Sequence, residues 1–166
     1  FLAAMLNSQP LGFYSASQLV QDAKRHGVEV RRVDVMSSEW DCTLEGLPHP
    51  PAVRLGLRLV AGLKAESALR ILKARRERPF DGAEDLARRA EIEQHEMTLL
   101  AAADALMSLA GHRRQQVWEA AGQRSAPQLL KQAPVNEEEL ELPAAPEGEE
   151  VVWDYAATGL TLRRHP

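Results

Sequence analysis

The feature that most constrains the fold is a short helical segment, a glycine turn and a longer helix in direct succession. The short segment is Leu59–Ala61, the turn is Gly62-Leu63, and an amphipathic helix is predicted from about Lys64 to Arg76. The residues predicted to face inward on the longer helix are Ala68, Leu69, Ile71 and Leu72. Aromatic residues make up only 5% of the 166-residue chain, which argues against a sandwich or barrel with an aromatic core. These observations predict a mainly α fold.

This succession is typical of a helix-hairpin-helix motif, and its physical chemistry suits a phosphate group. A glycine turn lets the backbone come close to a phosphate, and the free N–H groups that begin the second helix point at it. Lysine and arginine side chains nearby add contacts that do not depend on base sequence. The residues predicted to bind DNA are Gly62, Leu63, Lys64, Arg70 and Lys73. An ordinary helical hairpin with a solvated basic face is the alternative.

A second hairpin is predicted over residues 81–106, as a weaker copy of the first. Its turn, Glu91–Gln94, contains no glycine and carries two carboxylates where a phosphate would sit. A packing role is therefore favoured over a DNA contact for this turn. The two hairpins together predict a tandem helix-hairpin-helix domain.

The remaining segments complete the expected organisation. Two short extended runs flank a proline-rich loop and predict a β-hairpin, and a proline- and glutamate-rich stretch predicts a flexible acidic linker. The fold class is thus mainly α with a small β-hairpin, a tandem helix-hairpin-helix domain and an acidic linker. The predicted units are an α/β segment (1–40), the β-hairpin (41–57), the tandem domain (58–122), a disordered linker (123–150) and the start of a further domain (151–166).

Charge is distributed unevenly along the chain. Residues 54–91 hold ten basic and six acidic residues, whereas residues 136–154 hold eight acidic residues and no basic one. The first stretch could face a polyanion that the second would repel.

Cys42 is the single cysteine, which excludes a disulfide framework, and the five histidines show no metal-ligand spacing. No catalytic residue, metal site or membrane span is therefore predicted in this chain.

Several motifs, in the same order along nearly the whole chain, resemble bacterial C-family DNA polymerases. The similarity is to the error-prone, translesion branch, which is related to the replicative polymerase III alpha subunit. The segments that carry it are Leu6–Tyr14, Gln18–Ala23, His26–Val30, Val33–Val35, Val53–Leu57, Gly62-Leu63, Ala101–Leu106, Leu109–Gln115, Glu149–Val152, Asp154-Tyr155, Gly159-Leu160 and Leu162–Pro166.

The resemblance implies a piece that runs from the end of the fingers through the helix-hairpin-helix region towards an OB-fold domain. It implies binding of primer–template DNA in a DNA-directed DNA polymerase that acts in translesion synthesis and damage-induced mutagenesis. The catalytic aspartates and magnesium ions of such enzymes would lie upstream, so this piece is expected to be inactive alone and to need no cofactor. A cytoplasmic, nucleoid-associated location is implied.

Partners other than DNA are also implied by the resemblance. Replicative relatives carry a sliding-clamp-binding peptide after the hairpins, and the corresponding residues here are Gln128, Leu129 and Leu130. This stretch lacks the terminal phenylalanine of such peptides, and a plain linker is the alternative. An inactive Y-family polymerase homologue is a further implied partner. The competing hypothesis for the chain is a protein-interaction segment that docks accessory mutagenesis proteins or the clamp.

Overall fold

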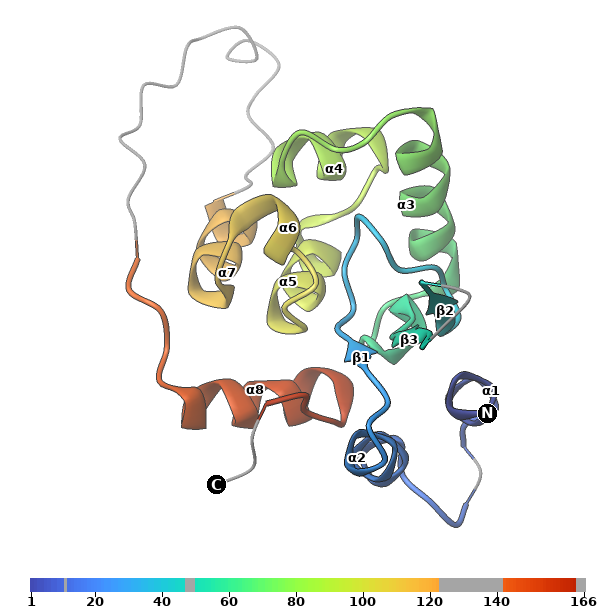
Figure 1. Ribbon diagram of the computed structural model, residues 1–166. Helices are drawn as coiled ribbons and strands as arrows, with labels where there is room; N and C mark the ends of the chain where they lie inside the picture. Colours follow the sequence, from blue (N-terminus) through green and yellow to red (C-terminus); the bar gives the residue numbers. More distant parts are fainter. Residues whose placement is uncertain (11, 47–49, 123–141, 164–166) are drawn as a thin grey trace, which may run out of the picture.

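The computed structural model describes residues 1–10, 12–46, 50–122 and 142–163 (Figure 1). Helices α3 to α7 gather on one side of a small sheet, and α2 and α8 lie below them in this view. The elements in chain order are α1 (Leu2–Asn7), α2 (Ala16–Arg25), β1 (Val30–Arg31), β2 (Thr43–Glu45), β3 (Ala52–Arg54), the 3-10 helix η1 (Leu57–Leu59), α3 (Ala65–Glu77), α4 (Ala83–Arg89), α5 (Gln94–Ala102), α6 (Met107–Ala110), α7 (Arg113–Gly122) and α8 (Glu147–Thr158). The mainly α class with a small β-hairpin is confirmed.

The predicted β-hairpin is confirmed as β2 and β3, which pair antiparallel with Leu44 opposite Val53. The strand β1 adds to the other edge of β3 in parallel, so the sheet order is β1-β3-β2. Glu45 on β2 accepts hydrogen bonds from Arg54 Nε at 2.9 Å and from Arg31 Nη1 at 2.9 Å. The hydrogen bonds from Arg54 are the main reason that the pKa of the Glu45 carboxyl is lowered. One carboxylate thus links all three strands.

Local signals explain both ends of α2. Ser15 caps α2 in a capping box with Gln18, and Gly27 follows the helix with φ +79°. The α3 helix matches its predicted range closely, but the prediction that Leu69 faces inward is wrong, because this side chain is 59% exposed. Positions 68, 71 and 72 are buried as predicted, and Leu69 lines a surface hollow beside Leu72.

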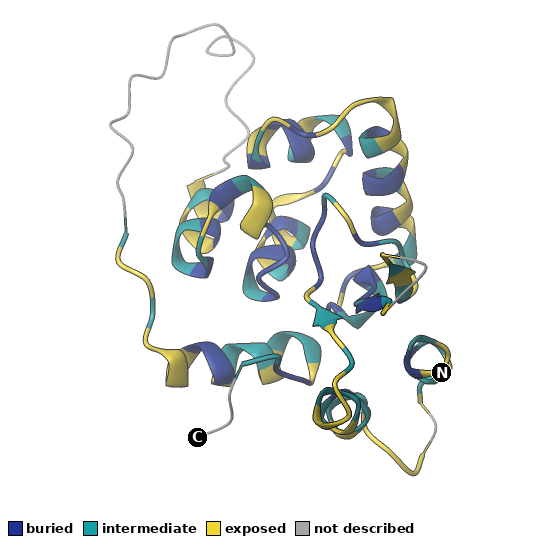
Figure 2. Ribbon diagram, in the orientation of Figure 1, coloured by how far each residue is buried: buried dark blue, intermediate teal, exposed yellow. Residues whose placement is uncertain are grey.

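The hydrophobic core is continuous from α1 to the segment after α8 (Figure 2). Leu6 and Val20 near the start of the chain and Leu160 near its end belong to the same cluster as Ile71 and Leu100 of the hairpins. The division into units stays a prediction, but residues 151–163 contribute to the core that the hairpins share. Their packing was not visible in the sequence.

The predicted linker needs one correction. Helix α8 begins at Glu147, inside the range 123–150, and its residue Glu150 is only 5% exposed. Glu150 is ordered by its ion pair with Arg113 at 3.0 Å, a long-range contact that composition does not reveal. The rest of the linker prediction falls mainly on residues 123–141, which lie outside the described residues.

Candidate nucleic-acid interface

The turn of the first hairpin joins η1 to α3 and is anchored from within. The Leu63 N–H donates to the Val60 carbonyl at 3.2 Å, and the Leu63 side chain is buried. Gly62 and Lys64 on either side of it are exposed. A buried apolar anchor between two exposed residues holds the turn in one position while its backbone faces outward.

Gly62 is required by the conformation of this turn. Its φ is +82°, in the left-handed region where glycine costs least. A Cβ at Gly62 would lie 3.3 Å from Leu99 Cδ1 of α5, so it would point into the protein. The glycine therefore serves backbone conformation and close packing on α5, and its direct approach to a phosphate stays a prediction.

The start of α3 offers backbone donors. Lys64 is the N-cap residue, with φ −83° and ψ 150°, and no side-chain cap is found there in the described part of the chain. Lysine has no oxygen with which to accept from the first-turn N–H groups, and these groups carry the positive end of the helix dipole. The Lys64 ammonium adds a full positive charge beside them, although Glu66 in the same turn opposes it.

The Arg70 guanidinium joins the two hairpins through hydrogen bonds. Its Nε donates to the Ala90 carbonyl at 3.0 Å, and its Nη2 donates to the Glu91 carbonyl and to Glu96 Oε2, each at 3.2 Å. The Ser67 hydroxyl donates to the same Glu96 carboxylate. Arg70 thus lies in the seam between α3 and the second hairpin.

Glu96 is held in its charged form by this seam. Burial raises its pKa, but hydrogen bonds from Ser67 and from the Glu93 N–H outweigh burial. The charges of Arg70 and Lys64 act in the same direction, so the pKa of Glu96 lies below its usual value. The first turn and the second hairpin are therefore linked electrostatically.

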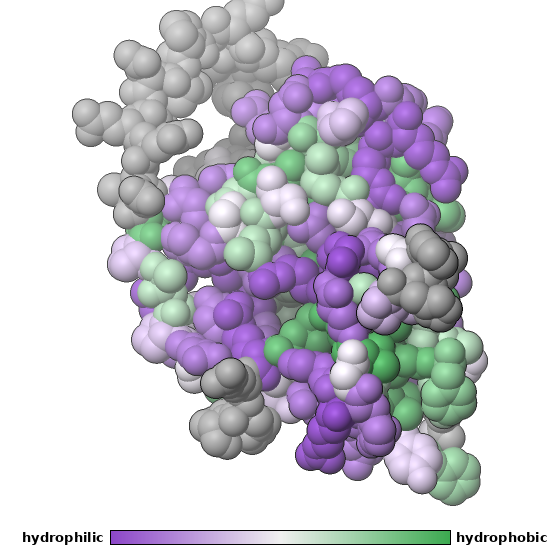
Figure 3. Space-filling model, in the orientation of Figure 1, coloured by the Kyte–Doolittle hydropathy of each residue, from purple (hydrophilic) through white to green (hydrophobic). Residues whose placement is uncertain are grey.

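Lys73 lies near the middle of α3. It follows Lys64 by nine positions, which places it about 13 Å farther along the helix axis. Lys73 borders a shallow hollow that is lined by Leu69, Leu72, Lys73, Arg76 and Glu77. The surface over α3 and α4 is largely hydrophilic (Figure 3). The structure brings Gly62, Leu63 and Lys64 together and places Lys73 elsewhere.

The turn of the second hairpin is closed by its own carboxylates. Glu91 adopts a positive φ of 51°, and Glu93 and Glu96 form a capping box at the start of α5. The Glu93 N–H donates to Glu96 Oε2 at 3.0 Å. These acceptors occupy the donors that a phosphate would need, which supports a packing role for this turn.

Helix α8, which follows the hairpins in the sequence, also contacts the residue before the first turn. The Ala61 N–H donates to the Ala157 carbonyl in the last turn of α8 at 2.8 Å. No sequence pattern indicated this contact, because both partners are backbone groups of alanines. The DNA-binding prediction for the turn thus omitted the helix that adjoins it.

Other predicted features lie outside this turn. Gln128, Leu129 and Leu130, the predicted clamp-binding residues, lie outside the described residues. Among the residues that the structure describes, no three His, Cys, Asp or Glu side chains gather in a way that could hold a metal ion. No described helix is both long and apolar enough to cross a membrane.

Comparison with known proteins decides the family. A family model described as the helix-hairpin-helix motif matches residues 27–116, which is more than half of the chain. The chain belongs to the helix-hairpin-helix family. The match covers β1 to β3, both hairpins and the start of α7, so it includes the first turn and the seam around Glu96.

Curated relatives confirm the resemblance found in the sequence. The chain is 54% identical to the error-prone DNA polymerase of Azoarcus sp. (strain BH72) and 52% identical to that of Aromatoleum aromaticum (strain DSM 19018 / LMG 30748 / EbN1). It is 48% identical to the error-prone DNA polymerase of Methylococcus capsulatus (strain ATCC 33009 / NCIMB 11132 / Bath). All of the chain aligns in each case. It spans 16% of the length of the first two relatives and 18% of the third.

Proposed function

We propose that this chain is a non-catalytic segment of an error-prone DNA polymerase and holds primer–template DNA. The observation that carries the proposal is the uncapped start of α3 behind the Gly62–Lys64 turn, within a helix-hairpin-helix match. The names of the relatives support a polymerase context. The role assigned to the segment is to grip the duplex while another part of the polymerase performs the reaction.

The proposed contact is made by backbone groups and one ammonium. The first-turn N–H groups of α3 donate to a phosphate oxygen, and Lys64 pairs with the same phosphate or its neighbour. Such contacts position a duplex without reading its bases, which suits a polymerase that must follow any template. Arg70 acts indirectly in this proposal, by fixing α3 against Glu96, and Lys73 lies too far along the helix to reach the same phosphate.

Nucleotide transfer and its magnesium ions are assigned to other parts of such a polymerase. The role proposed for this chain is to bind the duplex. Translesion synthesis, damage-induced mutagenesis and association with the nucleoid belong to the same proposal. Recruitment by a sliding clamp or by an inactive Y-family homologue is a further part of it, and no described residue argues for either partner.

Fluorescence anisotropy with a labelled primer–template duplex, titrated across salt, tests the proposal. We expect saturable binding that weakens steeply with salt, because phosphate contacts release counterions. Lys64→Glu should weaken binding and reduce the salt slope by about 1. Lys73→Glu is the matched control, because it makes the same charge reversal about 13 Å farther along the axis of α3.

The outcomes separate the two hypotheses for this chain. Loss of affinity in Lys64→Glu alone supports the contact at the turn. Equal losses in both variants mean that binding follows net charge only, and they overturn that contact. Absence of binding at low salt overturns the DNA-holding role and favours the docking of accessory proteins.

A further inference from the structure

Helix α8 touches the proposed DNA-binding turn through a backbone hydrogen bond. The carbonyl groups in the last turn of a helix have no partner within the helix. The Tyr155 carbonyl is satisfied by Gly159 N–H at 3.0 Å, and the Ala157 carbonyl is satisfied by Ala61 N–H at 2.8 Å. Ala61 directly precedes Gly62. A displacement of α8 would therefore change the position of the residue that precedes the turn.

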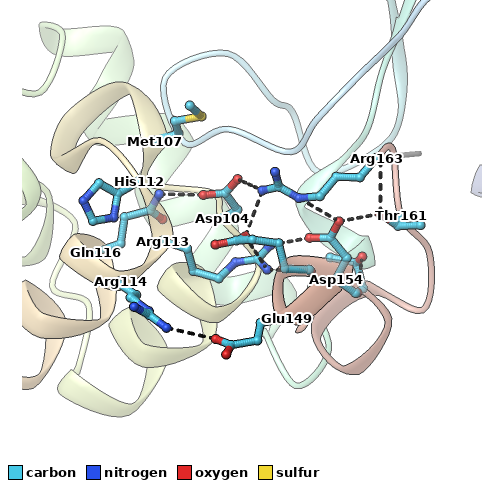
Figure 4. A network of polar contacts seen from close by, with 12 residues as sticks. Asp104, Met107, His112, Arg113, Arg114, Gln116, Glu149, Asp154, Thr161 and Arg163 are labelled. Atoms are coloured by element: carbon cyan, nitrogen blue, oxygen red, sulfur yellow. Dashed lines mark hydrogen bonds and ion pairs between the residues drawn. The ribbon is translucent and has the colours of Figure 1, made fainter. Parts of the chain in front are cut away.

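A buried ionic network holds α8 in place (Figure 4). Arg113 of α7 has a side chain that is only 1% exposed, and it pairs with Glu150 at 3.0 Å and with Asp154. Its Nη1 also donates to the Glu150 backbone carbonyl at 3.0 Å. Arg113 Nε is buried without a hydrogen-bond partner among the described residues, so this guanidinium depends strongly on its two carboxylates.

The network extends to the segment after α8, to the turn between α5 and α6 and to the segment between β1 and β2. Arg163 lies 2.8 Å from Glu150 and 3.5 Å from Asp154, measured between ionic atoms. Asp104, in the turn between α5 and α6, pairs with Arg163 at 3.5 Å and with Arg32 at 2.8 Å. Three arginines thus face three carboxylates, and the whole network joins α7, α8 and the segment before β2.

We propose that α8 is a positioning element for the Gly62–Lys64 turn and that Asp154 and Glu150 strengthen DNA binding although both are acidic. The proposal rests on the DNA-holding function proposed above. Loss of one carboxylate leaves Arg113 buried with too little negative charge, which loosens the docking of α8. The Ala157 carbonyl then holds Ala61 less firmly, and the donors at the start of α3 lose their fixed direction.

The sign of the effect distinguishes positioning from simple electrostatics. If α8 acts only through its charge, removing any of its carboxylates weakens repulsion of a polyanion and tightens binding. If α8 positions the turn, removing Asp154 weakens binding. Glu147 provides a matched control, because it is an exposed carboxylate on the same helix and has no ion pair among the described residues.

The test compares Asp154→Asn with Glu147→Gln in the 166-residue chain, using the same labelled primer–template duplex. Each change removes one negative charge from α8. We expect Asp154→Asn to weaken binding about three- to tenfold, in the range typical of mutations that change the coupling between two sites, and Glu147→Gln to leave binding unchanged or slightly tighter. Unchanged or tighter binding in Asp154→Asn overturns the proposal.

Hydrogen exchange measured by NMR provides a readout that needs no DNA. Asp154→Asn should speed exchange of the Ala61 amide more than exchange of core amides such as that of Leu100. Equal acceleration at both amides indicates general destabilisation and overturns the positioning role. Should Asp154→Asn fail to fold, Thr161→Val replaces it, because Thr161 Oγ1 donates to Asp154 at 2.6 Å and accepts from the Arg163 N–H at 3.1 Å, so its loss loosens the same network while both charges stay.

The Lys64→Glu variant separates this proposal from the function on which it rests. If Lys64→Glu leaves DNA binding unchanged, the DNA-holding function of the turn fails, whatever the exchange rates are. If Lys64→Glu weakens binding and Asp154→Asn does not, only the positioning role fails. In the double variant, we expect the loss from Asp154→Asn to shrink, because its effect passes through the same turn.

Discussion

Replacing Gly62 by alanine tests the conformation of the first turn and its link to DNA in one experiment. Gly62 has φ +82°, and a left-handed alanine costs about 1–2 kcal/mol relative to glycine. Alanine also lowers the conformational entropy of the unfolded chain, which stabilises the folded state by roughly 0.4–1 kcal/mol. The new Cβ would meet Leu99 Cδ1 at 3.3 Å, and the end of this flexible side chain can move aside. The expected net loss of stability is about 1 kcal/mol.

Gly27 supplies the control for this experiment. It has φ +79° at the end of α2, and no atom lies within 4 Å of a Cβ placed there. Gly27→Ala should therefore cost about the same stability, roughly 1 kcal/mol, through the backbone alone. Gly62 lies on the proposed DNA-binding turn and Gly27 does not, so only Gly62→Ala should weaken DNA binding.

Urea denaturation followed by circular dichroism measures the loss of stability, and anisotropy with labelled duplex measures the loss of DNA affinity. About 1 kcal/mol corresponds to a fall in Tm of roughly 2–4 °C for a chain of this size. Affinity for DNA should fall about fivefold in Gly62→Ala, if a similar free energy is lost from the contact. Equal affinity losses in the two variants would refute the reasoning, and so would an unchanged stability of Gly62→Ala.

Two further predictions concern carboxylates of the second hairpin. Glu96→Gln should lower the free energy of unfolding by about 1–3 kcal/mol, because this carboxylate accepts hydrogen bonds from both hairpins. An unchanged urea midpoint would contradict that role. At Asp85, burial raises the pKa, but hydrogen bonds from Arg88, the Asp81 N–H and Arg89 outweigh it and, with the charge of Arg78, lower it to about 2. The stability from Asp85 should be complete above its ordinary pKa of 3.8 and be lost as the pH falls through about 2. Unfolding measured from pH 5 to pH 2 should therefore depend less on pH in Asp85→Asn than in the original chain, and identical slopes would contradict the pairing.

The hairpin elements were predictable because their signals are local. A glycine at the turn, a proline after α3 and an apolar stripe along it act within a few residues of each other. The β-hairpin was predictable for the same reason, since β2 and β3 are close in sequence. The strand β1 was harder to pair, because its parallel partner β3 lies beyond β2 and the loop that follows it.

The candidate site was predicted only in part. Gly62, Leu63 and Lys64 come together because they are consecutive. Arg70 was predicted to bind DNA from its charge, but its hydrogen bonds to Ala90 and Glu96 exist only once the two hairpins pack. A basic residue on a helix has the same local pattern whether it faces a ligand or a neighbouring helix.

The sequence by itself determined the helical hairpins, the glycine turn and the family, because these depend on short-range patterns and on motif order. Only the tertiary structure decided which charges are free and what supports the turn. Arg113 meets Asp154 across 41 positions and Arg32 meets Asp104 across 72. Such pairs form because the packing of distant segments brings opposite charges together, and no local periodicity records which partner will be chosen.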